Sequence, residues 1–242
     1  MDREELYNSI ADRKTKQKDF EPYAGDNGRV NRCVSLMRSG KILTGGVLLD
    51  VGAGIGDLGH AVSDLFERRI ALDISPTGLY AAKMKGNETK VCDVDRHGLP
   101  FPDKTIDVVT ALDFIEHIID PESFARECYR VLRSSGDAFI NTPNIRFWRH
   151  IEQLWRFGSF PHTSGDREVY HGGHLAFYTF ADLCEIFGRV GFVGFTMFKD
   201  DEGYENPPDV WTRPLQPKNQ EEYVKLCLEF GCPNLLFKAT RP

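Results

Sequence analysis

Short apolar runs alternate along the chain with segments in which apolar and polar residues recur at helical spacing. The run at 47–51 is followed by three alternate glycines, and similar runs lie near 69–74, 89–92, 105–112 and 136–142. Runs of this length are typical of buried strands, whereas apolar residues at i, i+3, i+4 and i+7 indicate helices that bury one face. The alternation predicts an α/β protein in which right-handed crossovers build a parallel sheet with helices on both faces.

The same periodicity places the expected helices. We expect them at 29–38, 58–66, 76–85, 121–133, 179–190 and 220–230. Further strands are expected at 191–198 and 235–240, separated by a connection at 199–232 that is too long for a simple turn. The polar segment that ends near residue 27 is expected to be either a frayed terminus or a flap over a site.

The bulk composition is that of an ordinary globular protein. Hydrophobic residues make up 41% of the 242 residues, and no apolar run approaches the roughly 20 residues of a membrane span. The first residues have no signal-peptide pattern, so we expect a cytoplasmic protein with no membrane partner. The six scattered cysteines predict neither a disulfide framework nor a zinc site. The net charge of −6 disfavours a broad nucleic-acid surface.

Candidate chemistry gathers where the predicted strands end. Gly52, Gly54 and Gly56 suit a turn that needs positive φ and lets a ligand approach the backbone, although such a triplet alone also fits a simple strand-to-helix turn. Asp73 ends the next strand, where an acidic side chain meets ribose hydroxyls in a doubly wound sheet; a turn or helix-capping role is the alternative. Asp93 follows the third strand. Ligands bind at this edge of such sheets.

Four segments together resemble the motifs of class I S-adenosylmethionine-dependent methyltransferases. The likeness covers about residues 43–193, with motifs at 48–56, at 71–75, at 92–94 with 99–101, and at 112–118 with 120–121. The segment 130–136 is similar to the one that follows these motifs in the family, but Ser134 and Ser135 stand where the family usually has Lys-Pro. This departure falls in a turn and puts no catalytic residue in doubt.

The resemblance implies a Rossmann-like, doubly wound sheet of seven strands, mostly parallel with the last strand antiparallel. It implies S-adenosyl-L-methionine as the cofactor, with the glycine turn under its methionine part, Asp73 on the ribose hydroxyls and Asp93 on the adenine amine. The cofactor-binding residues expected by this likeness are Asp50, Gly52, Ala53, Gly54, Asp73, Ile74, Asp93, Val94 and Leu112.

We expect one methyltransferase domain over residues 1–242. Its parts are an N-terminal flap and helix (1–40), a cofactor-binding core (41–143), an acceptor cap insertion (144–178), and a C-terminal helix and β-hairpin (179–242) that contains the insertion 199–232.

The cap sequence suggests the class of methyl acceptor. Residues 144–174 hold four of the seven histidines, several interleaved aromatics and a small excess of arginine in an otherwise acidic chain. These residues need not contact a ligand, because aromatic side chains commonly pack in a core and arginines commonly lie on a solvated face. The basic cap nevertheless predicts an anionic acceptor, such as a phosphorylated or carboxylated sugar or metabolite. The stretch 170–179 also resembles methyltransferases that act on small molecules and surface glycans.

Two arrangements for activating an acceptor hydroxyl remain open. In the first, His171 or His174 acts as a general base that Glu116 and His117 orient. In the second, Asp113, Glu116, His117 and His174 hold Mg²⁺ or Mn²⁺, as in the metal-assisted branch of the family, which includes small-RNA and ubiquinone-pathway O-methyltransferases. Residues at i, i+3 and i+4 share one helix face, but the same pattern is common in relatives that use no metal. The first arrangement is favoured.

Three other functions stay open. The fold also hosts N-methyltransferases of small metabolites. An RNA 2′-O-methyltransferase is disfavoured because a pI of 5.7 implies no broad basic surface. An inactive cofactor-binding module is disfavoured because the glycines and both cofactor aspartates are present. The residues do not predict the oligomeric state or the identity of the acceptor.

Overall fold

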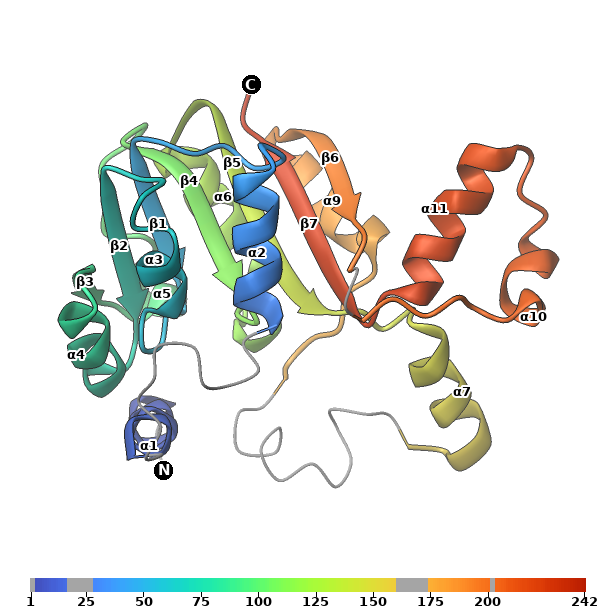
Figure 1. The fold of residues 1–242 in the computed structure, drawn as a ribbon, viewed down its shortest axis with the longest axis horizontal. Coiled ribbons are helices and arrows are strands. Elements are labelled where there is room, and N and C mark those ends of the chain that lie inside the picture. Colours follow the sequence, from blue (N-terminus) through green and yellow to red (C-terminus); the bar gives the residue numbers. More distant parts are fainter. Residues whose placement is uncertain (1–2, 17–27, 160–173, 201–202) are drawn as a thin grey trace.

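The computed structural model describes residues 3–16, 28–159, 174–200 and 203–242. A seven-stranded sheet forms the centre of these residues, with strand order β3-β2-β1-β4-β5-β7-β6 (Figure 1). The strands are β1 (Val47–Val51), β2 (Arg68–Asp73), β3 (Glu88–Val91), β4 (Ile106–Leu112), β5 (Leu132–Pro143), β6 (Val193–Phe198) and β7 (Asn234–Thr240). All seven predicted strands are therefore present.

The pairing confirms the predicted Rossmann-like sheet. Strands β1 to β5 pair in parallel, and β7 pairs antiparallel with both β5 and β6. The chain runs outward from β1 to β3 and then returns to place β4 on the other side of β1. Strand order reverses between β1 and β4, and ligands of such sheets bind beyond the carboxyl ends of the strands at this point.

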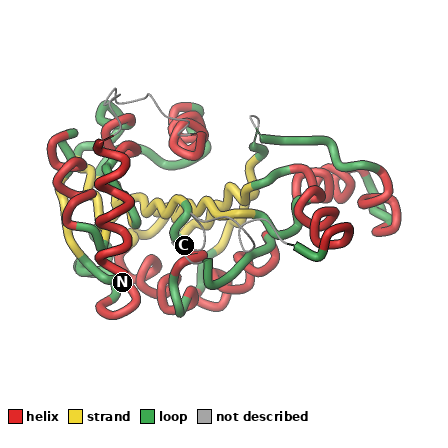
Figure 2. The backbone as a smooth tube through the Cα atoms, turned by 90° about the horizontal axis from the view of Figure 1, so that it is seen from below, coloured by secondary structure: helices red, strands yellow, loops and turns green. Residues whose placement is uncertain are grey.

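Helices cover both faces of the sheet, as Figure 2 shows from below. They are α1 (Arg3–Lys16), α2 (Gly28–Arg38), α3 (Asp57–Ala61), α4 (Pro76–Met84), α5 (Val94–His97), α6 (Pro121–Val131), α7 (Trp148–Phe157), α9 (Phe180–Val190), α10 (Asp209–Thr212) and α11 (Gln220–Gly231), with 3-10 turns η1 (Ile115–His117) and η2 (Arg213–Leu215). Helices α2 and α3 pack on one face and α6 and α9 on the other, each over its own buried apolar cluster. No helix among the described residues is long and apolar enough to cross a membrane.

The helix predicted at 58–66 is wrong in its second half. Helix α3 ends at Ala61, and the chain continues through turns in which Ser63 N bonds to His60 O and Leu65 N bonds to Val62 O. These bonds span three residues and not four, so the α-helical pattern stops although Val62 and Phe66 still face the core.

The helix α1 was not predicted, because its sequence lacks an apolar stripe. It lies against α4 through Asn8, whose side-chain oxygen accepts a hydrogen bond from Ser75 Oγ at 2.7 Å and contacts Thr77 N at 3.4 Å. By contrast, α9 begins with a capping box, in which the Thr179 and Asp182 side chains accept hydrogen bonds from each other's backbone N–H groups.

Helices α7, α10 and α11 lie beside the sheet, to the right in Figure 1. The buried side chain of Asn144, between β5 and α7, joins this segment to the end of α11, because its Nδ2 donates to the carbonyl oxygens of Glu229 and Cys232 at 2.7 and 2.8 Å. Arg146 adds an ion pair to Glu229.

Candidate active site

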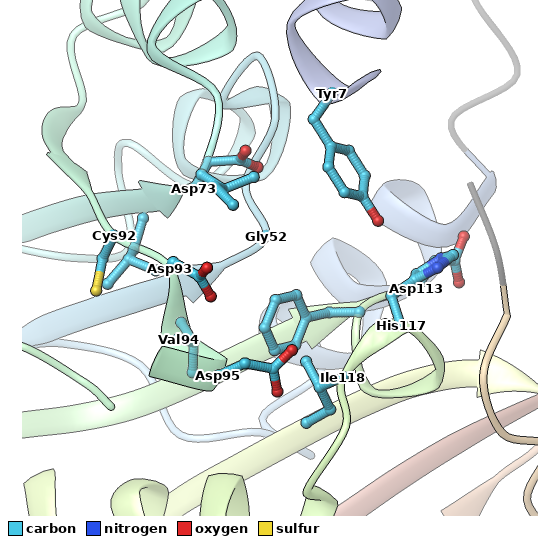
Figure 3. Close-up of a pocket in the computed structure, with 13 residues that line it drawn as sticks. Tyr7, Gly52, Asp73, Cys92, Asp93, Val94, Asp95, Asp113, His117 and Ile118 are labelled. Atoms are coloured by element: carbon cyan, nitrogen blue, oxygen red, sulfur yellow. The ribbon is translucent and has the colours of Figure 1, made fainter. Parts of the chain in front are cut away.

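A pocket of about 520 Å³ opens at the carboxyl ends of the strands, at the predicted switch point (Figure 3). Its lining includes Gly52 after β1, Asp73 at the end of β2, and Asp113 just after β4. The sheet therefore brings together, at one edge, residues that are far apart in the sequence.

The glycine turn after β1 reaches the pocket at Gly52. Gly52, Gly54 and Gly56 have φ values of 71°, 53° and 74°, a region that side chains other than glycine rarely adopt. A Cβ atom on Gly52 would also lie 2.7 Å from the ring of Phe114. Both the conformation and the close approach therefore require glycine, and the backbone at Gly52 is left bare toward the pocket.

Asp73 links the ends of β1 and β2. One of its carboxylate oxygens accepts a hydrogen bond from Gly54 N at 2.8 Å, and the other accepts one from Ser75 N at 2.8 Å. Ser75, and not Asp73, is the N-cap of α4, since its Oγ accepts from Gly78 N at 3.0 Å. The predicted bond from Asp73 to ribose hydroxyls stays a prediction.

The far side of the pocket is formed by the segment after β3. Asp93 and Val94 line it, as does Ile74 after β2. Asp93 begins α5, and its carboxylate lies 3.4 Å from Arg96 Nε. The predicted adenine contacts of Asp93 and Val94 are compatible with these positions and stay predictions.

Four of the predicted cofactor residues are not in the pocket lining. The carboxylate of Asp50 is buried and accepts a hydrogen bond from Thr110 Oγ1 at 2.8 Å, and burial raises its pKa to about 7. Gly54 turns its N–H toward Asp73, as described above. Ala53 packs against the small apolar cluster under α4, and Leu112 is buried in the core on the α2 face.

Asp113 occupies a strained corner between β4 and η1. Its φ of 51° is uncommon for a residue other than glycine. Its N–H donates to Asn141 O at 2.8 Å, while its carboxylate accepts a hydrogen bond from Asn141 Nδ2 and is ion-paired with Arg29 of α2. These three contacts fix the direction in which the carboxylate points.

Glu116, His117 and His174 form a cluster beside the pocket. One ligand atom from each lies within 4.8 Å of the others, and the two imidazole rings meet edge to face at 4.7 Å. Glu116 is 1% exposed; its Oε2 accepts from Thr142 Oγ1 at 2.8 Å, while Oε1 has no hydrogen-bond partner among the described residues. Burial, together with the charge of Asp113, raises the pKa of Glu116 to about 8.

The structure thus joins three of the five residues predicted for acceptor activation or metal binding. His171 lies outside the described residues. Asp113, predicted as a metal ligand, lies close enough to Glu116 to raise its pKa but is itself held by Arg29 and Asn141. A backbone hydrogen bond joins the two segments that contribute to the cluster: Leu175 N, next to His174, donates to Glu116 O at 2.7 Å.

Sequence reasoning missed two residues at this edge of the sheet. Tyr7 of α1 lines the pocket and points toward the side where His117 lies, with ring centroids 6.4 Å apart (Figure 3). Arg29 was predicted only as part of a helix. No pattern in the sequence marks Tyr7, and Arg29 is one of three arginines in α2, so its charge alone does not single it out.

Apart from Tyr7, the residues that line the pocket fall within a segment that matches a family model. Residues 49–140 match the family model described as a methyltransferase domain. This segment is less than half of the chain, and it contains the glycine turn, Asp73, Asp93 and the 112–118 motif.

Two curated relatives are similar to part of the chain. A protein of Mycobacterium tuberculosis named as a probable S-adenosylmethionine-dependent methyltransferase is 34% identical over 97 residues, which cover 40% of this chain and 35% of the relative. The ubiquinone biosynthesis O-methyltransferase of Xanthomonas oryzae is 32% identical over 108 residues, 42% of this chain and 45% of the relative. The chain therefore spans less than half the length of these curated relatives.

The fold has close structural neighbours at low sequence identity. A chain of the Haloferax volcanii complex between the Trm112 methyltransferase activator and a methyltransferase superposes with a TM-score of 0.65 and 19% identity, with 100% of each chain covered. At this identity the likeness shows the fold alone.

Proposed function

We propose that the protein is an S-adenosylmethionine-dependent methyltransferase that acts on a hydroxyl group of a small molecule or sugar. The observation that carries the proposal is the position of two sets of side chains at one edge of the sheet. Gly52 and Asp73 line a pocket that we assign to the cofactor, and His117, which lines the same pocket, belongs to the cluster with Glu116 and His174.

The reaction is an in-line displacement at the methyl carbon. An acceptor oxygen forms the new C–O bond while the C–S bond breaks, so that S-adenosylhomocysteine leaves and the hydroxyl proton passes to a base. Alignment of the acceptor atom with the methyl group supplies much of the rate acceleration. The pocket wall that holds His117 and Asp113 is where such an acceptor would approach.

His174 is the proposed base of this reaction. Its imidazole contacts the ring of His117, and the buried carboxyl of Glu116 lies within reach of both rings. An imidazole titrates near neutral pH and is suited to accept the proton of a hydroxyl. Glu116, itself held by Thr142, orients the two rings.

The same three residues fit a divalent ion. Glu116 Oε1 is a buried acceptor without a hydrogen-bond partner among the described residues, and the cluster adds two imidazoles to it. This donor set suits Mn²⁺ or another transition ion better than Mg²⁺, which prefers oxygen ligands in octahedral geometry. When bound there, the ion would lower the pKa of an acceptor hydroxyl.

The anionic class of acceptor has less support from the cap than its sequence suggests. Arg146 is paired with Glu229, Arg149 with Glu205, and Arg156 with the glutamate one helical turn earlier. Within the described residues of the cap the positive charge is therefore balanced. We propose a hydroxyl acceptor as the class and treat a phosphate or carboxylate on it as a separate question.

Methyl transfer from labelled S-adenosylmethionine tests the proposal. The protein would be incubated with matched pairs of acceptors, each pair a neutral sugar or phenol and its phosphorylated or uronic counterpart, and with amines of similar size. Label on a hydroxyl, lost in His174→Ala, is the expected result, and preference within a pair decides the question of charge. Label on amines alone would contradict hydroxyl transfer.

A further inference from the structure

We propose that α7 is a dimer contact, in which its apolar face packs antiparallel against α7 of a second copy of this chain, about a two-fold axis at Leu154. The helix lies outside the pocket lining and outside the segment 49–140 that matches the family model. The proposal therefore does not depend on the reaction that the protein catalyses. It assigns an oligomeric state, which the sequence does not predict, to one helix face.

The apolar face of α7 is open to solvent. Trp155, Phe157 and Leu154 are 79%, 74% and 50% exposed. Ile151, Leu154 and Trp155 follow at i, i+3 and i+4, so they share one side of the helix, with Phe157 at the edge of that side. A surface helix usually buries such a side against its own domain, but α7 lies beside the sheet (Figure 1). Exposed apolar patches of a few hundred Å² commonly mark interaction sites.

The area of this face suits a dimer of moderate affinity. The exposed fractions of Trp155 and Phe157 correspond to roughly 300 Å² of aromatic surface, and Leu154 adds to it. A two-fold contact buries the face of both copies, so it removes roughly 800 Å² of apolar surface from water before flanking residues are counted. Specific interfaces begin near about 1,000 Å² of total buried surface. A dissociation constant on the order of micromolar is therefore expected.

The order of residues along α7 is complementary to its own reverse. Glu152 and Arg156 stand two positions to either side of Leu154 and form an ion pair at 3.0 Å within the helix. A two-fold axis at Leu154 places Glu152 of each copy opposite Arg156 of the other, which gives two further pairs of opposite charge. The same axis places Ile151 opposite Phe157 of the other copy. Charged and apolar positions therefore both find matching positions in an antiparallel copy.

The charge of α7 favours a second copy over a lipid surface. Helices that lie on anionic membranes carry an excess of lysine and arginine on their polar face. In α7, Arg149 is paired with Glu205 and Arg156 with Glu152, so the positive charge is balanced within the chain. A face that is apolar, rich in aromatic residues and flanked by balanced charge is typical of a protein interface.

The oligomeric state of the full chain, measured by sedimentation equilibrium, tests the contact. Wild type is expected to pass from monomer to dimer between about 0.1 and 100 µM. Leu154→Asp is expected to raise the dissociation constant at least about 100-fold, because the change enters the contact twice and places two carboxylates at the axis. Met84→Asp, at a side chain that is 71% exposed on α4, is the matched control and should dimerise like wild type.

Two charge reversals test the antiparallel register. Glu152→Arg and Arg156→Glu should each weaken the homodimer about 10-fold or more, because each sets like charges opposite each other. Mixed in equal amounts, the two variants should form a mixed dimer with nearly wild-type affinity, since every arginine at these positions then faces a glutamate. Variants that merely damaged the helix would not recover on mixing.

A wild-type protein that stays monomeric at about 100 µM would overturn the proposal. Binding of that monomer to vesicles of phosphatidylcholine and phosphatidylglycerol would then identify a lipid surface as the occupant. A dimer that Leu154→Asp leaves intact would place the contact elsewhere, and charge variants that form no mixed dimer would contradict the antiparallel register. Either of these results also overturns the proposal.

Discussion

Asp73, the last residue of β2, accepts a hydrogen bond from the backbone N–H of Gly54 at 2.8 Å. A single carboxylate therefore holds the turn after β1 in place while it faces the pocket. The acid that is expected to bind the ribose also shapes the loop that is expected to lie under the methionine. Cofactor affinity should depend strongly on this one side chain.

Replacing Asp73 by alanine is expected to weaken S-adenosylhomocysteine binding at least 10- to 100-fold. The change removes the ligand's acceptor and leaves the N–H groups of Gly54 and Ser75 without their partner, each charged hydrogen bond being worth about 1.5–3 kcal/mol. Calorimetric titration measures the loss. Asp64→Ala, at an exposed ion pair, is the control, and equal affinity of the Asp73 and Asp64 variants would contradict the expected ribose contact.

The His174→Ala variant should bind S-adenosylhomocysteine normally and lose about 10²–10⁴-fold in turnover. The reason is that His174 lies in the cluster with Glu116 and His117 and not in the pocket lining. Single-turnover rates and ligand affinity are to be measured on the same preparation. Full activity of this variant would remove His174 as the base.

Turnover is expected to persist after dialysis against EDTA, because we propose His174 as a base that needs no metal, and because Asp113, the fourth predicted metal ligand, is held by Arg29 and Asn141. The measurement is the methyl-transfer rate before and after dialysis, with Mg²⁺, Mn²⁺ and Zn²⁺ added back singly. Loss of activity that one ion restores would assign that ion to Glu116, His117 and His174.

Asp50 makes the stability of the fold depend on pH. Burial raises the pKa of this carboxyl from 3.8 to about 7, so the folded state holds a proton that the unfolded state releases. The free energy of unfolding that Asp50 contributes is therefore fully present below about pH 4 and falls between pH 4 and 7, by at most about 1.4 kcal/mol per pH unit.

Denaturation of wild type and Asp50→Asn across pH 4 to 8 isolates this contribution. The isosteric amide cannot ionise, so the difference in unfolding free energy between the two proteins should shift in favour of the variant as pH rises, and level off above pH 7. A difference that does not vary with pH would show that Asp50 ionises equally in both states.

Tyr7 connects α1 to the pocket, because its ring lies edge to face with His117 and lines the cavity. Tyr7→Ala is expected to weaken S-adenosylhomocysteine binding about 2- to 10-fold, the value of one aromatic contact. Tyr7→Phe, which keeps the ring, should bind like wild type. If both variants lose affinity equally, the hydroxyl and not the ring makes the contact.

The core of the fold was predictable because each of its strands is a local apolar pattern. Runs such as 47–51 and 105–112 are buried along nearly their whole length, so periodicity alone places them. The end of α3 was not predictable in this way, since Val62 and Phe66 continue the apolar pattern while the backbone has already left the helix.

The candidate site was predictable only in the parts that short motifs carry. The glycine turn, Asp73 and Asp93 lie at strand ends, where the fold itself directs them to one edge. Arg29 and Asp113 are 84 residues apart, and their pairing depends on how α2 packs beside β4. The position of Tyr7 depends on the bond between Asn8 and Ser75, 67 residues away, and no local pattern reports such a contact.

Calorimetric titration of the wild-type protein with S-adenosylhomocysteine tests the central claim most directly. The pocket at Gly52, Asp73 and Asp93 predicts one binding site per chain, with a dissociation constant on the order of micromolar. Absence of binding at millimolar ligand would contradict the assignment of this pocket to the cofactor.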